Sequence, residues 1–214
     1  MIELRNSDLD TLINRRNQVD DREKYFIDFL IALLRVESHY LIWPYGINNF
    51  QIGERVFAYE FYHQWRKISE EFDYQNLIIN GEIRKDGSIY RHSNIGQVYP
   101  DLILHEQQNN LNQQRIACEI KTSKALKHKN GQKQFKKDLI KLSSYHHELS
   151  FDYCVFLQIL DIEDCLVTSI IPYLLRIQDQ LSDLDSIYLI IKDFETVRYD
   201  TIQNILLNSQ NLRT

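Results

Sequence analysis

Two charged residues, Glu119 and Lys121, interrupt an otherwise apolar segment that the sequence predicts to be a β-strand. Residues two apart on a strand point to the same face, so the carboxylate and the ammonium group are expected to lie side by side. Asp101, which precedes Glu119 by 18 residues, lies in a second predicted strand and could bring another carboxylate to this point. Converging carboxylates are suited to Mg²⁺, and a lysine beside the metal could orient or deprotonate a water and stabilise charge on a phosphate.

The same three residues also have simpler interpretations. Glu119 and Lys121 could form an ordinary solvated ion pair on the sheet. Asp101, which follows Pro100, could be a turn or strand-end residue. Their occurrence together, after a helix that carries glutamates, favours a site.

A basic segment begins at Lys121. Eight lysines and a single acid, Asp138, lie between positions 121 and 141, so this segment carries a charge of +7 while the rest of the chain carries −12. Such a segment beside a metal site is suited to holding phosphates. The residues expected to contact nucleic acid are Lys124, Lys127, Lys129, Lys133, Lys137 and Lys141. The alternative is an ordinary solvated helix face.

The motif formed by Pro100-Asp101 and Glu119-Ile120-Lys121 resembles the PD-(D/E)XK pattern of the restriction-endonuclease-like nuclease superfamily. The order of predicted elements over residues 50–160 is also similar: a helix with a glutamate, a hairpin, the strand with the E-x-K motif, a helix and a further strand. The resemblance implies that Asp101 and Glu119 hold Mg²⁺, with Mn²⁺ as an alternative, and that the Ile120 carbonyl is a further ligand. Lys121 would act on the attacking water.

The superfamily often adds a glutamate from the preceding helix. Glu60 is our choice by this resemblance, because it borders the apolar stripe of that helix. Glu54 lies closer to the stripe, but it occupies the helix start, where the helix dipole favours an acid in any case. Glu82, a polar residue in an apolar predicted strand, is a third candidate.

Hydrophobic periodicity predicts the elements that must position these residues. One stripe of large apolar side chains indicates a helix over 54–72. Strands are predicted over 77–84, 98–104, 115–122, 153–160 and 187–191, and further helices over 133–147, 172–181 and 201–207. The segment 42–53 is interpreted as a connection. The prediction is an α/β fold with a central mixed β-sheet flanked by helices and a restriction-endonuclease-like core.

We expect a single domain over residues 1–214. Residues 1–50 would form an N-terminal helical extension, 51–160 the nuclease-like core, and 161–214 a C-terminal helix–strand–helix segment that completes the sheet. Residues 25–34 are apolar on nearly all sides, which indicates either a buried helix or one covered by a partner subunit in a homodimer.

The composition is that of a folded protein and excludes fibrous and linker-rich classes: 43% of the residues are hydrophobic and 26% are charged, with only 3 Pro and 6 Gly. The net charge of −5 does not by itself indicate nucleic-acid binding. Three widely spaced cysteines in apolar surroundings are interpreted as buried thiols in a reducing compartment. We found no targeting segment and no membrane-spanning run, so a cytoplasmic protein without a membrane partner is expected.

The functional expectation is a Mg²⁺-dependent nuclease that hydrolyses phosphodiester bonds of nucleic acid, and DNA is the expected substrate. The alternative is a catalytically inactive nuclease-like fold that serves as a nucleic-acid-binding or protein-interaction module, since a fold does not determine a function.

Overall fold

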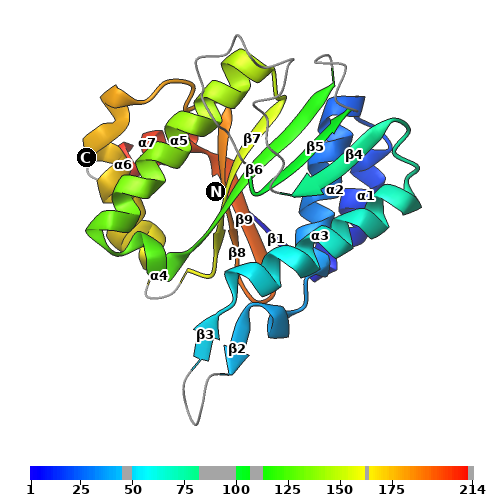
Figure 1. The fold of residues 1–214 in the computed structure, drawn as a ribbon, viewed down its shortest axis with the longest axis horizontal. Coiled ribbons are helices and arrows are strands. Elements are labelled where there is room, and N and C mark those ends of the chain that lie inside the picture. The colour runs from blue at the N-terminus through cyan, green and yellow to red at the C-terminus, as the bar shows by residue number, and fades with distance from the viewer. Residues whose placement is uncertain (45–49, 82–99, 107–112, 162–163, 212–214) are drawn as a thin grey trace.

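The computed structural model describes residues 1–44, 50–81, 100–106, 113–161 and 164–211. Within these ranges, seven strands form one mixed sheet in the order β1-β9-β8-β7-β6-β5-β4 (Figure 1). The strands are β1 (Ile2–Arg5), β4 (Leu77–Gly81), β5 (Leu102–Glu106), β6 (Gln114–Thr122), β7 (Tyr153–Ile159), β8 (Ile187–Lys192) and β9 (Thr196–Thr201). A separate short hairpin pairs β2 (Ile42–Pro44) with β3 (Phe50–Ile52).

The direction of the strands decides which ends of them meet. Strands β4, β5 and β6 are antiparallel neighbours, whereas β6, β7 and β8 run parallel to one another. The start of β5 therefore lies at the same edge of the sheet as the ends of β6 and β7. Ligand sites of α/β sheets commonly form at the carboxyl ends of parallel strands. Asp101 directly precedes β5, so this topology places it beside the E-x-K motif at the end of β6.

Helices cover both faces of the sheet. In Figure 1, α1, α2 and α3 lie on one side of the sheet, and α4, α5, α6 and α7 lie on the other. The helices are α1 (Leu9–Arg16), α2 (Asp21–Arg35), α3 (Glu54–Glu71), α4 (Ser123–Leu126), α5 (Lys129–Leu149), α6 (Ile171–Ile177) and α7 (Ile202–Asn211). Short turns of other helix types are η1 (Asn6–Asp8), η2 (Ser38–Tyr40), η4 (Leu166–Ile170) and η5 (Gln178–Gln180).

Alternating residues of β6 supply the two cores. Ile116, Cys118 and Ile120 belong to the core beneath α2 and α3, whereas Ala117 belongs to the core beneath α5. Because the side chains of a strand alternate, Glu119 and Lys121 lie on the α5 side of the sheet.

Helix α2 is apolar on nearly all sides over residues 25–34, and the rest of its own chain covers this part. The residues from Phe26 to Leu34 are buried within one molecule, against α1, α3 and the sheet. Its single buried acid, Asp28, accepts hydrogen bonds from Arg16 Nε at 2.6 Å and from the Tyr74 hydroxyl at 2.7 Å. The intrachain alternative is therefore the one observed, and the apolar surface of α2 is no longer a reason to expect a homodimer.

The α/β class and the mixed sheet are confirmed, but several boundaries differ from the prediction. Residues 1–50 are not only a helical extension, since β1 pairs with β9 as an edge strand of the main sheet. The segment 42–53 contains the β2–β3 hairpin. The C-terminal segment adds two strands instead of one, because β9 precedes α7. These strands were missed because they are short or half-polar, so that their pairing partners, and not their own pattern, determine them.

Candidate active site

Asp101 continues the strand pairing at the point where β5 begins. In the antiparallel register, Leu102 lies opposite Cys118. One step further, the Asp101 carboxylate accepts a hydrogen bond from the Ile120 backbone N–H, with Oδ2 and N 2.7 Å apart. This hydrogen bond ties Asp101 to the backbone of the E-x-K motif. The prediction placed Asp101 inside a strand over 98–104, whereas β5 begins one residue after it, at Leu102.

Lys121 lies among carboxylates. Its Nζ is 3.6 Å from Asp101 Oδ2 and 3.9 Å from Asp138 Oδ2, and it donates a hydrogen bond to the Ile120 carbonyl at 2.9 Å. Burial lowers the pKa of Lys121, but the charges of Asp101, Asp138 and Glu119 outweigh this effect, so the pKa is raised overall. Lys121 therefore remains an ammonium group. In this arrangement it can donate hydrogen bonds to a water or a phosphate.

Glu119 is a buried acid with a basic partner. Its side chain is 3% exposed, and its Oε1 lies 2.5 Å from Lys141 Nζ. Burial, together with the charge of Asp101, raises the pKa of Glu119 to about 7 in spite of the opposing charge of Lys141. Lys141 was expected on the phosphate-binding face of the helix. The structure instead pairs it with Glu119, because α5 packs with this flank against β6.

Asp138, the single acid of the basic segment, belongs to the same cluster, and no role in the site was predicted for it. It is buried, Gln134 Nε2 donates a hydrogen bond to its Oδ1 at 2.8 Å, and its Oδ2 is buried without a hydrogen-bond partner in the structure. Burial raises the pKa of Asp138. Helical spacing could have identified this residue, since Asp138 falls on the stripe that also contains Phe135 and Leu142.

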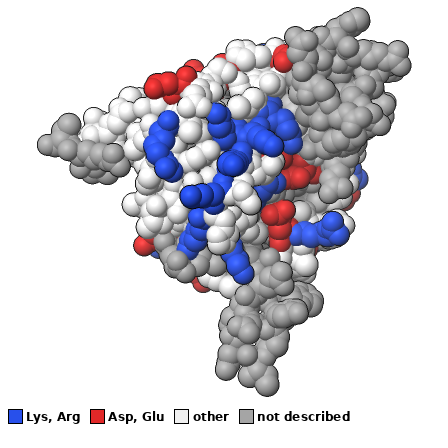
Figure 2. Space-filling view, turned by 60° about the vertical axis from the view of Figure 1, so that its left-hand side comes forward, with Lys and Arg blue, Asp and Glu red and all other residues white. Residues whose placement is uncertain are grey.

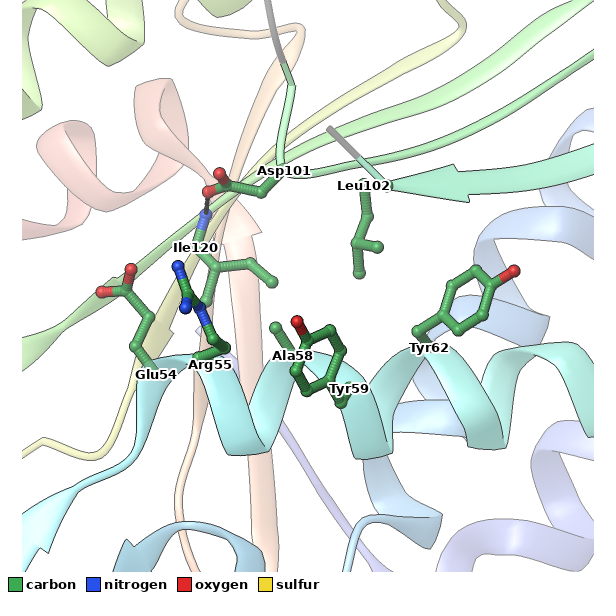
Figure 3. Close-up of a pocket in the computed structure, with 9 residues that line it drawn as sticks. Glu54, Arg55, Ala58, Tyr59, Tyr62, Asp101, Leu102 and Ile120 are labelled. Carbon is green, nitrogen blue, oxygen red and sulfur yellow. Dashed lines mark hydrogen bonds between the residues drawn. The ribbon is translucent and has the colours of Figure 1, made fainter. Parts of the chain in front are cut away.

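The structure brings Glu54 to the site in place of Glu60. Glu54 is the first residue of α3 and lines the same cavity as Asp101 and Ile120 (Figure 3). Desolvation, supplemented by the charge of Asp101, raises the pKa of Glu54 although Lys121 opposes this effect. Glu60 lies on the other flank of α3, where it accepts a hydrogen bond from Gln64 at 2.5 Å, and it does not line the cavity. Glu82 lies outside the described residues.

The balance of charge in this cluster is negative. Four carboxylates face two ammonium groups, and the residues are Glu54, Asp101, Glu119, Asp138, Lys121 and Lys141. Burial is the main cause of the raised pKa values of Glu54, Glu119 and Asp138, and the charge of Asp101 adds to it in each case. A hard divalent cation would neutralise it, so the donor set fits Mg²⁺ in type and in charge. As the side chains now lie, the described part of the chain contains no group of three or more His, Cys, Asp or Glu residues close enough to hold a metal ion.

A cavity of about 510 Å³ opens beside this cluster. Side chains of α3 form one wall, and the ends of the strands form the other (Figure 3). The lining residues are Glu54, Arg55, Ala58, Tyr59, Tyr62, Gly81, Asp101, Leu102 and Ile120.

A basic surface lies on α4 and α5. Figure 2 shows Lys and Arg side chains gathered on this side of the molecule, with acidic side chains at the border. Four of the six lysines expected to contact nucleic acid are exposed: Lys124, Lys129, Lys133 and Lys137. Lys127 is half-buried. Lys133 and Lys137 thus face solvent as predicted, whereas Lys141, which was predicted on the same face, pairs with Glu119.

Comparison with known proteins adds no relative: no family model, curated protein or solved structure matches this chain. In the part of the chain that the structure describes, no helix is long and apolar enough to span a membrane. All three cysteines are buried and unlinked, as predicted: Cys118, Cys154 and Cys165.

Proposed function

We propose that this protein is a metal-dependent nuclease of the restriction-endonuclease-like type, which hydrolyses phosphodiester bonds in nucleic acid, with DNA as the proposed substrate. Asp101, Glu119 and Glu54 are the carboxylates assigned to Mg²⁺ or Mn²⁺, and the Ile120 carbonyl is the further ligand. The observation that carries the proposal is the negatively charged cluster around Lys121 at one edge of the sheet. The exposed lysines of α4 and α5 support it, because they offer binding partners for a phosphate backbone next to that cluster.

In the proposed reaction, a water oxygen forms a bond to phosphorus while one P–O ester bond breaks, the water releases its proton to solvent, and the leaving oxygen takes up a proton from solvent. A divalent cation held by Asp101, Glu119 and Glu54 would supply Lewis acidity and lower the pKa of a bound water. The ammonium group of Lys121 donates hydrogen bonds that orient the water and stabilise charge on the phosphate. The Asp138 carboxylate attracts that ammonium group across 3.9 Å, and a hydrogen bond from Gln134 orients Asp138.

The two glutamates of α3 provide a matched test. Glu54→Gln removes a proposed metal ligand, whereas Glu60→Gln makes the same chemical change on the opposite flank of the same helix. Cleavage of labelled single-stranded and duplex oligonucleotides would be measured with Mg²⁺, with Mn²⁺ and with a chelator. We expect Glu54→Gln to reduce the cleavage rate by on the order of 100-fold or more, and Glu60→Gln to change it by less than about 2-fold.

Lys121 and the two remaining acids extend this test. Lys121→Ala is expected to abolish cleavage while metal binding, measured by calorimetry, persists. Asp101→Asn and Glu119→Gln are expected to weaken both cleavage and metal binding. Full Mg²⁺-dependent activity in either acid variant would show that the assigned ligand set is wrong.

One observation favours a second candidate function, a nucleic-acid-binding module without activity. Glu119 is held by Lys141 instead of being free for a metal, and the described residues contain no assembled group of three metal-binding side chains. In that case the wild-type protein would bind oligonucleotides without cleaving them in either metal, and Lys121→Ala would bind with the same affinity.

A further inference from the structure

The cavity beside Asp101 differs in character from the carboxylate cluster next to it. Its α3 wall carries Ala58, Tyr59 and Tyr62, and Leu102 contributes an apolar side chain from the strand wall. Its volume of about 510 Å³ lies within the range of roughly 300–1,000 Å³ that is usual for small-molecule sites. We propose that this cavity receives an unpaired nucleobase that stacks on Tyr59, so that the substrate is a single strand or a frayed strand end. This inference rests on the proposed function.

Tyr59 is the side chain best placed to recognise a base. It is 69% exposed, the largest value among the exposed large hydrophobic residues of the described part of the chain. Phe57, Phe61 and Trp65 of the same helix are fully buried, and Tyr62, which also lines the cavity, is half-buried. In Figure 3 the Tyr59 ring lies on α3 beside Ala58, with its hydroxyl directed toward the side of the cavity where Asp101 and Leu102 lie. An aromatic ring left in solvent beside a cavity is suited to stacking on a planar ligand.

Arg55 adds a second planar group to the cavity wall. Its side chain is exposed and rises from the first turn of α3 between Glu54 and Tyr59 (Figure 3). A guanidinium group can stack on a base or bind a phosphate, and both occur in single-strand binding. Gly81 lines the opposite wall, where a Cβ would lie only 3.3 Å from the Asp101 carbonyl oxygen.

The charge of the cluster explains why the ligand of this cavity would be a base and not a phosphate. Two acids, Glu54 and Asp101, and one base, Arg55, line the cavity, so that without a bound cation it disfavours anions, whereas the exposed lysines lie on α4 and α5. A neutral, planar base avoids this repulsion while the backbone follows the lysines. A base inside an intact duplex has both faces covered by its neighbours, so it must lose its stacking and pairing before it can enter the cavity. A base in an unpaired strand has no pairing to lose.

Two variants of α3 test the inference by different routes. Tyr59→Ala removes the stacking ring, and Ala58→Phe fills the cavity from the same wall. Binding of a labelled 12-nucleotide single strand and of a blunt hairpin duplex would be measured by fluorescence anisotropy in a chelator, and cleavage of both would be measured with Mg²⁺. We expect the wild-type protein to bind the single strand more tightly than the duplex.

Each variant is expected to weaken single-strand binding by roughly 5- to 100-fold, as for the loss of one base–aromatic stack, and to leave duplex binding unchanged. The salt dependence of binding should not change in either variant, because neither removes a cation. Tyr59→Phe keeps the ring and should weaken binding by less than about 2-fold. Circular dichroism spectra matching the wild type would show that the variants are folded.

The outcomes separate this inference from the proposed function. If the protein cleaves nucleic acid with Mg²⁺ but both variants bind single strands as the wild type does, the base site is overturned and the nuclease stands. Tighter binding of the intact duplex, unaffected by both variants, would have the same meaning. If the wild-type protein neither binds nor cleaves either oligonucleotide, the proposed function fails and the base site fails with it.

Discussion

Burial of Glu119 makes the stability of the fold depend on pH. In the folded chain its pKa is about 7, against an ordinary value of 4.5, because the carboxylate is desolvated next to Asp101. Between these two pH values the folded chain holds more protons at this position than the unfolded chain does. The contribution of Glu119 to the free energy of unfolding therefore decreases as the pH rises from about 4.5 to 7.

The two pKa values determine the size of this effect. Their difference of about 2.5 corresponds to about 3 kcal/mol, at about 1.4 kcal/mol for each pH unit. Solvent does not screen the charge substantially, since the side chain is 3% exposed. Glu119→Gln is a permanent analogue of the protonated acid, and Lys141, whose side chain is 29% exposed, can turn its ammonium group to solvent when it loses its partner. The variant should match the wild-type protein near pH 4.5 and be more stable by up to about 3 kcal/mol near pH 8.

Urea unfolding at several pH values between 4.5 and 8, without divalent metal, measures this difference. Glu70→Gln is the control, because Glu70 is exposed on α3 and pairs with the exposed Arg66 at 3.6 Å. The free energy of unfolding of Glu70→Gln should change with pH in the same way as that of the wild-type protein. If that of Glu119→Gln also changes with pH as the wild type does, the carboxylate is not desolvated as the structure implies, and the electrostatic reasoning about the cluster is refuted.

Two further predictions concern the basic surface and the N-terminal helices. Replacing Lys129, Lys133 and Lys137 together by Gln should make the slope of log affinity against log salt less negative by about 2 on single strands, at about 0.7 for each phosphate contact. An unchanged slope would identify these lysines as an ordinary solvated face. Asp28→Asn should destabilise the fold by about 3–5 kcal/mol in urea unfolding, because it leaves Arg16 without its buried carboxylate partner. Arg15→Gln, which removes only the exposed pair with Glu23, should cost less than about 1 kcal/mol, and equal losses in the two variants would contradict this account.

Geometry along the chain explains why part of the site could be predicted. A strand alternates its side chains wherever it is placed, so the spacing of Glu119 and Lys121 was sufficient to put them on one face. The helix over 54–72 was equally clear, because its apolar stripe repeats every turn. A topology with antiparallel β5 and β6 then brought Asp101 to the same edge, as expected from the order of the predicted elements.

The remaining site residues depended on how helices pack on the sheet. Both Glu54 and Glu60 border the apolar stripe of α3, and only the placement of the helix decides which flank lines the cavity with Asp101. On α5, the same kind of placement moved Lys141 from the expected solvent face to Glu119 and brought Asp138 to Lys121.

The sequence by itself therefore determined the elements with strong internal periodicity and the facing of residues within each of them. Only the tertiary structure decided the edge strands β1 and β9, the covering of α2 by its own chain, and the partners of the buried charges. The physical reason is the range of the interactions. Periodicity and turn chemistry act between residues a few positions apart, whereas strand pairing, desolvation and the choice of ion-pair partners arise between residues that only the folded chain brings together.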